Sequence, residues 1–167
     1  MNKKIILGLF FLLFIIFFAC KRNDTEQALL YNNQIVLLQD ELTADVDTFL
    51  QSVNYPEANT AILYKSAQNT SQTVTNKLKS IKQFEGGTAL FLETQNYINT
   101  CQTALQDEGS RIVHLKAKLS VNYNKDELEI LNRTADSLFQ KVNVAAMKFD
   151  KVQMEFARKY QFDIDRP

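Results

Sequence analysis

Four long segments of the chain carry apolar residues at alternating spacings of three and four. Such spacing gathers apolar side chains on one face of an α-helix, because the helix turns once every 3.6 residues. Glycine and proline, which a β-sandwich of this size would need for its many turns, are scarce. The pattern therefore predicts four helices, at about 24–53, 56–84, 88–119 and 124–162.

The first and last predicted helices have the most regular apolar rows. Polar pairs that fit a capping box stand at their starts, Asp24 with Gln27 and Asn124 with Glu127. Pro56 ends the first helix, because proline disfavours helical geometry at the residue before it, and suits the first position of the next helix. The rows are Ala28, Tyr31, Ile35, Leu38, Leu42, Val46, Phe49 and Val53 in the first helix, and Leu128, Leu131, Ala135, Leu138, Val142, Ala145, Phe149, Val152 and Phe156 in the last.

The two middle helices have weaker rows. Small and polar residues fill the centre of the second helix, at 67–73, and lower its intrinsic helicity. Gly86 and Gly87 supply the left-handed backbone that ends a helix. Gly109 predicts a kink in a continuous third helix, because the apolar row resumes in phase after it. The rows are Thr60, Tyr64, Ala67, Ser71, Val74, Leu78 and Ile81 in the second helix, and Phe91, Thr94, Ile98, Cys101, Leu105, Ile112 and Leu115 in the third.

Four amphipathic helices of similar length with short connections predict antiparallel neighbours. The arrangement that buries all four rows is an all-α, up-down-up-down four-helix bundle over residues 24–162. The near-heptad spacing implies a shallow left-handed twist. Residues 163–167 are expected to fray from the end of the fourth helix.

A different pattern precedes the predicted bundle. Lys3 and Lys4 are followed by an uncharged run at 5–19, then by Cys20 and a polar stretch. The run has 15 residues, and a membrane-spanning helix needs about 20. A positive start, an apolar centre and a small residue before a polar stretch are typical of a secretory signal peptide.

The segment Phe17-Phe18-Ala19-Cys20 resembles the lipobox of bacterial lipoproteins. Ala19 and Cys20 match that pattern, whereas Phe17 and Phe18 stand where Leu and a small residue are usual. Phenylalanine-rich signals of this kind are similar to those of Bacteroidota lipoproteins. The resemblance implies that residues 1–19 are cleaved as a signal peptide, that the Cys20 thiol receives a diacylglyceryl group with palmitate-type chains, and that the new amino terminus is acylated.

The resemblance also implies a location in the cell. Residues 20–23 become a lipid-anchored tether, and the exported bundle is held at the outer membrane, with the inner membrane left open. Several acyl chains suffice for stable anchoring, since each buried methylene contributes roughly 0.8 kcal/mol. Three alternatives remain at this point: a signal peptide cut elsewhere, an uncleaved membrane anchor, and a disulfide between Cys20 and Cys101.

The charge balance disfavours one class of partner. Residues 1–19 hold two lysines and no acid, so 17 basic and 19 acidic residues remain after cleavage, a net charge of −2. Nucleic-acid binding requires a basic face. We therefore expect no nucleic-acid partner and no polybasic membrane patch.

Few residues of the predicted bundle suggest catalysis or metal binding. His114 is the only histidine, and Arg111 stands three residues before it, so the Glu-x-x-His pairs of di-metal bundles are missing. Cys101 lies in an apolar row with no histidine within several turns on its helix, which favours a small buried hydrophobe over a nucleophile. We expect no cofactor and no enzymatic activity.

Two further groups have a structural and a functional interpretation. The acids Asp126, Glu127 and Glu129 begin the last helix, where stabilisation by the helix dipole is favoured over a divalent-ion site. Small residues of three helices fall near one height of the bundle, where close helix approach is favoured over a cavity for an apolar ligand. These small residues are Ala67, Ser71, Cys101, Val142 and Ala145.

The sequence thus predicts a lipid-anchored helical protein of the cell envelope that binds or scaffolds a protein partner. The alternative is a carrier or sensor of a small apolar ligand held between the helices. The helical part is similar to small helical lipoproteins of Bacteroidota and spirochaetes, a resemblance that implies no functional residues.

Overall fold

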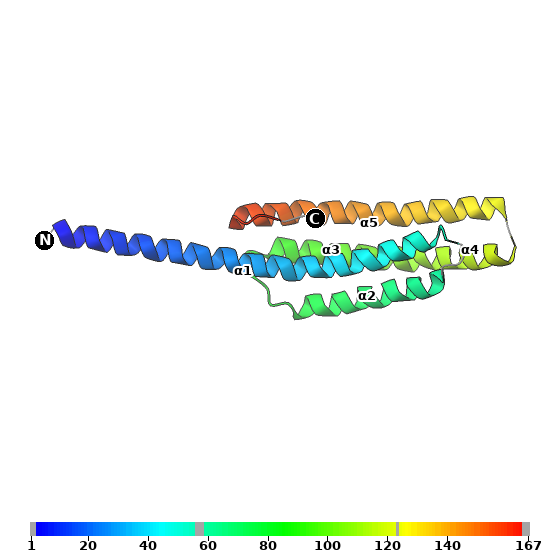
Figure 1. The fold of residues 1–167 in the computed structure, drawn as a ribbon, viewed down its shortest axis with the longest axis horizontal. Helices are drawn as coiled ribbons and strands as arrows, with labels where there is room; N and C mark the ends of the chain where they lie inside the picture. The colour runs from blue at the N-terminus through cyan, green and yellow to red at the C-terminus, as the bar shows by residue number, and fades with distance from the viewer. Residues whose placement is uncertain (1–2, 56–58, 123, 165–167) are drawn as a thin grey trace.

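The fold is a bundle of helices in the computed structural model, which describes residues 3–55, 59–122 and 124–164, with side chains from residue 24 onward. Its elements are α1 (Lys3–Ser52), α2 (Thr60–Ser80), α3 (Thr88–Ala104), the π-helical turn η1 (Leu105–Gly109), α4 (Ser110–Val121) and α5 (Lys125–Tyr160). Because α3, η1 and α4 follow one another without a break, the bundle has four rods (Figure 1). The predicted all-α four-helix bundle is confirmed.

Successive rods run in opposite directions. On α1 and α2, Lys77 donates to Glu41 at 2.7 Å and Thr70 donates to Asp45 at 2.6 Å, so later residues of α1 pair with earlier residues of α2. On the other side of the bundle, α5 returns along α3 and α4. Figure 1 shows the same alternation along the whole bundle.

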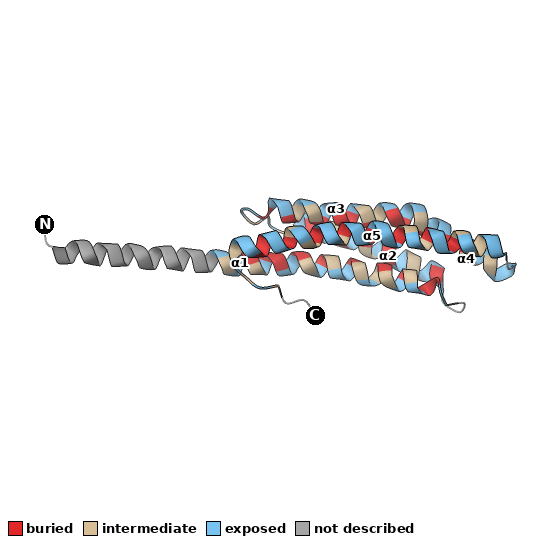
Figure 2. Cartoon of the chain, turned by 90° about the horizontal axis from the view of Figure 1, so that it is seen from above, coloured by how far each residue is buried: buried red, intermediate tan, exposed pale blue. Residues whose placement is uncertain are grey.

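The apolar rows form the core, as predicted. All eight residues of the first predicted row, from Ala28 to Val53, are buried, and most of the row on α5 is buried with them. Buried positions follow the inner faces of the helices and exposed positions the outer faces (Figure 2). Burial of these rows supplies the main stabilisation, since each fully buried large apolar side chain contributes roughly 1.5–3 kcal/mol.

The first helix begins earlier than predicted. No helix start lies at Asp24, because the helical backbone continues back to Lys3 through residues 20–23. The segment before Asp24 contains no proline, and its leucines, isoleucines and alanine do not oppose helix. From residue 24 onward, where side chains are described, no helix is long and apolar enough to cross a membrane.

We call the end of the bundle where α1 enters the proximal end and the opposite end the distal end. The proximal end holds the α2–α3 connection and the end of α5 (Figure 1). There Thr25 Oγ1 donates to the Tyr160 carbonyl at 2.9 Å. Rings from three parts of the chain pack together at this end: Tyr31, Phe84, Phe156, Tyr160 and Phe162.

The predicted boundaries of α2 are wrong at both ends. Asn59 caps the helix by accepting from the Ile62 amide at 3.2 Å, so the helix begins at Thr60; Pro56 lies outside the described residues. The helix ends at Ser80 rather than 84, and Phe84 turns inward to the aromatic rings. Gly86 has the left-handed φ of +80°, but in the connection and not at the helix end.

The third rod is continuous through Gly109, as predicted, and its irregularity is the π-helical turn η1. A π turn holds one residue more than an α turn and often marks a functional position. Gly109 is buried, and a Cβ at this position would come within 2.8 Å of the Tyr64 ring. The glycine is therefore needed for space, because its φ of −59° is open to any residue.

This contact predicts an unusual result for Gly109→Ala. Alanine is normally about 1 kcal/mol better than glycine inside a helix, but overpacking against Tyr64 costs about 1–3 kcal/mol. We expect Gly109→Ala to lower the urea midpoint of unfolding. In a Tyr64→Ala background the same change should raise the midpoint, and a loss of stability in both backgrounds would contradict the contact as its cause.

The last helix begins as predicted and ends two residues before the predicted position 162. Asn124 Oδ1 accepts from the amides of Asp126 and Glu127, at 2.9 and 3.2 Å, so the helix begins at Lys125. It ends at Tyr160, where Gln161 adopts a left-handed φ of 59°. Residues 162–164 have no regular structure, and 165–167 lie outside the described residues.

Candidate functional site

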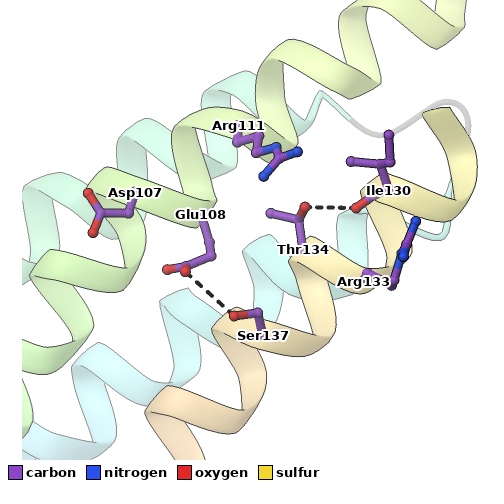
Figure 3. Close-up of a pocket in the computed structure, with 7 residues that line it drawn as sticks. All are labelled: Asp107, Glu108, Arg111, Ile130, Arg133, Thr134 and Ser137. Atoms are coloured by element: carbon purple, nitrogen blue, oxygen red, sulfur yellow. Dashed lines mark hydrogen bonds between the residues drawn. The ribbon is translucent and has the colours of Figure 1, made fainter.

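A charged groove lies between the π-helical turn and α5, toward the distal end of the bundle (Figure 3). Its volume is about 480 Å³, and it is open to solvent. One wall comes from η1 and the start of α4, and the other from the first turns of α5. The lining residues are Asp107, Glu108, Arg111, Ile130, Arg133, Thr134 and Ser137.

Hydrogen bonds from two residues of α5 hold the Glu108 side chain in this groove. One carboxylate oxygen, Oε1, accepts from Lys141 Nζ at 2.6 Å and from Ser137 Oγ at 3.5 Å. The other oxygen, Oε2, is buried and has no hydrogen-bond partner among the described residues, and the side chain is only 15% exposed. A buried acceptor without a donor costs about 1–3 kcal/mol, so Oε2 can accept a donor from a bound group.

Two guanidinium groups face the same groove. Arg111 points between the walls and makes no ion pair within the described part of the chain (Figure 3). Arg133 pairs with Glu129 one turn away at 3.6 Å, but both are mostly exposed, so this pair is weak. Planar guanidinium groups bind carboxylates through two parallel hydrogen bonds. The groove can therefore hold an acidic side chain against the arginines.

The sequence-predicted lipid acceptor cannot be placed in this geometry. The Cys20 side chain lies outside the described residues, so lipidation there stays a prediction. His114 is exposed on α4 and does not line the groove.

The acids at the start of α5 have structural partners. The amides of Asp126 and Glu127 donate to Asn124, Glu127 also pairs with Lys118, and Glu129 pairs with Arg133. In the described part of the chain, no three His, Cys, Asp or Glu side chains come together in a way that could hold a metal ion. These contacts favour the helix-start interpretation of the acidic residues.

Cys101 belongs to a small polar cluster inside the core. Tyr97 and Cys101 are fully buried on α3, and the Tyr97 hydroxyl is 2.7 Å from Thr43 Oγ1 on α1. Burial raises the pKa of the Cys101 thiol to about 12 and raises the pKa of Tyr97 as well. Both groups are therefore protonated at neutral pH, which supports the interpretation of Cys101 as a buried core residue.

The small residues at mid-height bring α2 and α3 close together. Ala67, Ser71 and Cys101 are buried. Gln102 Nε2 donates across the interface to the Ser71 carbonyl at 3.2 Å and to Thr75 Oγ1 at 2.9 Å. These contacts favour close helix approach at this level over a space for a ligand.

Comparison with known proteins finds no matching family model, no matching curated protein and no matching solved structure. The fold defines the chain as a four-helix bundle with a charged groove.

Sequence reasoning missed the groove altogether. Glu108 and Lys141 are 33 residues apart in the chain, and only the antiparallel packing of α5 on the π turn brings them together. The one available signal was the helical interruption around Gly109, which marked the position of the π turn without its chemistry.

Proposed function

We propose that this protein is a membrane-anchored lipoprotein whose helical domain binds a protein partner outside the cytoplasm. The signal peptide is removed before Cys20, the thiol carries the acyl chains, and the bundle stands on the outer membrane, with the inner membrane as the alternative. The positive start, the 15-residue apolar run and the Ala19-Cys20 pair support this proposal.

The groove of Figure 3 is the proposed partner-binding site, and its position is the observation that carries the proposal. It lies toward the distal end, while α1 extends toward residue 3 from the opposite end (Figure 1). A bundle anchored through Cys20 would therefore present Arg111, Arg133 and Glu108 away from the membrane. The partner would offer an acidic side chain to the arginines and a donor to Glu108.

Replacing the proposed lipid acceptor tests the anchor. We expect Cys20→Ser to abolish labelling by radioactive palmitate and to move the protein from the membrane fraction to the supernatant, because no acyl chain is attached. Cys101→Ala is the matched control, and it should keep both the label and the membrane attachment. Labelling of Cys20→Ser, or a mature terminus that does not start at Cys20, would overturn the anchor.

Site-specific crosslinking tests the groove. We expect a photoreactive residue at Ser137, which lines the groove, to form one discrete adduct in intact cells. Arg111→Glu in the same chain should remove this adduct by repelling the acidic partner group. A photoreactive residue at Lys65, an exposed position on α2, is the control. An adduct of equal yield with Arg111→Glu would exclude the groove as the binding site.

The carrier hypothesis has no specific observation in its favour and stays a prediction. A bound apolar ligand must raise the melting temperature. A lack of stabilisation by saturating fatty acids or quinones would therefore remove it.

A further inference from the structure

A second groove lies at the proximal end of the bundle, between α1, the α2–α3 connection and the last turn of α5. It is larger than the distal groove, at about 890 Å³, and is open to solvent. Residues of both charges line it. Lys82 and Glu85 come from the connection, Asp24 from α1 and Lys159 from α5.

The four charged groups of this groove have one property in common. None of them forms an ion pair among the residues that the structure describes. Lys159 is the best placed: a Cβ on Gly86 would come within 2.7 Å of its Nζ, so the ammonium lies directly over the connection. Two cations and two anions thus face one space without neutralising one another.

The wall of the groove also contains a buried hydroxyl without a partner. Tyr31 is only 5% exposed, lines the groove, and its phenol oxygen makes no hydrogen bond within the described residues. Burial raises the pKa of Tyr31, so the hydroxyl is a donor at neutral pH. An unpaired buried hydroxyl costs stability unless a ligand satisfies it.

The connection that forms this wall is held in place. Phe84 packs against Tyr31, Phe156 and Tyr160, with ring centroids 5.1–6.0 Å apart. The Tyr160 hydroxyl donates to the Glu85 carbonyl at 3.0 Å. The charges are therefore carried by a preorganised loop, which lowers the entropy cost of binding.

The groove also stands close to the proposed anchor. Asp24 follows Cys20 by four residues on the continuous helix α1, which is one helical turn or about 6 Å along its axis. The headgroup layer of a bilayer is about 5–8 Å thick on each side. The mouth of the groove would thus meet phospholipid headgroups.

We infer that the proximal groove binds the zwitterionic headgroup of a membrane phospholipid of the phosphoethanolamine type. This inference depends on the proposed lipid anchor for its location, and on the groove alone for its chemistry. Lys82, Lys159 and the Tyr31 hydroxyl bind the phosphate, while Asp24 and Glu85 bind the ammonium. Occupation of the groove would hold the bundle upright on the bilayer.

The test uses the purified full-length lipoprotein in maltoside micelles and the water-soluble probe glycerophosphoethanolamine. We expect the probe to raise the melting temperature and to give a measurable dissociation constant by calorimetry. Inorganic phosphate and ethanolamine, tested separately, should each bind at least about tenfold more weakly, because each satisfies only half of the site. Equal binding of inorganic phosphate would overturn the headgroup in favour of a simple anion site.

Variants locate the binding. Lys82→Gln with Lys159→Gln should weaken the affinity for the probe by about tenfold or more. Lys79→Gln with Lys151→Gln, which removes two exposed lysines that do not line the groove, should leave it unchanged. Tyr31→Phe should weaken binding while the protein without probe keeps or gains stability, a combination that a purely structural role would not produce.

Two results would overturn the inference: no rise in melting temperature at tens of millimolar probe, or unchanged affinity in the Lys82 and Lys159 variant. Its failure is separable from that of the anchor. Palmitate labelling of Cys20 reports the anchor without the groove. Binding of the probe by unlabelled Cys20→Ser protein would keep the groove without the anchor.

Discussion

Leu138→Asp is expected to abolish folding of the bundle. Leu138 is fully buried on α5 and belongs to the hydrophobic core that all four rods share. The change removes an apolar side chain, which costs about 2–5 kcal/mol, and adds a buried carboxylate without a partner. Together these terms approach the whole stability of a domain of this size, which is about 5–15 kcal/mol. Circular dichroism should show loss of helix and of the cooperative thermal transition.

The neighbouring residue provides a matched control for this result. Phe139 is on the same helix and 49% exposed. Phe139→Asp introduces the same charge one position away, but the carboxylate keeps its water. We expect this variant to remain folded with a melting temperature close to that of the wild type. Equal loss of structure in both variants would show that charge on α5, and not burial in the core, is responsible.

The buried residues were predicted best in the helices whose apolar rows are most regular. All eight residues of the first predicted row are buried, and so are six of the nine in the last row. The last helix also buries three residues outside the predicted row: Thr134, Gln153 and Ala157. The end of α2 could not be predicted, because it depends on tertiary contacts, whereas its start follows from a local signal, the Asn59 cap, which the prediction missed. Phe84 leaves the helical path to join rings from α1 and α5, and nothing in residues 81–87 alone indicates this.

The third rod shows a second limit of sequence patterns. Its predicted row included Ile98, Cys101 and Leu105, but Leu90, Tyr97 and Ala104 are also buried in the core. A strict three-and-four row describes a narrow stripe, whereas a helix between two neighbours buries a wider face. Beyond η1 the predicted row continues in the core, since Ile112 and Leu115 are buried.

Neither groove was predicted from the sequence, for a related physical reason. Each groove brings charged residues together from elements far apart in the chain, and charged residues on a helix are ordinarily solvated. Their grouping becomes visible only once the register between the rods is known. The same holds for the Thr43–Tyr97 contact, whose two residues are 54 positions apart.

The buried polar cluster at Tyr97 and Cys101 leads to the second large effect, a loss of stability at alkaline pH. Burial raises the pKa of both groups in the folded protein, that of Cys101 from 9.0 to about 12. Each group therefore makes its full contribution to the free energy of unfolding at a pH below its pKa in the unfolded chain. This contribution is lost as the pH rises through its pKa in the folded protein. For Cys101 alone, a difference of about three pKa units corresponds to a loss on the order of 4 kcal/mol between about pH 9 and 12.

Urea unfolding at pH 7, 9, 10 and 11 measures this loss. We expect the free energy of unfolding to be flat near neutrality and to fall steeply above pH 9. Lys116 acts in the opposite direction, since burial lowers its pKa, but it is a single and partly exposed group. Cys101→Ala should reduce the slope of the free energy of unfolding against pH by the equivalent of about one proton. In the wild type, only the thiol of the unfolded chain loses its proton in this pH range. A fall of unchanged slope in Cys101→Ala would show that the thiol is not the source.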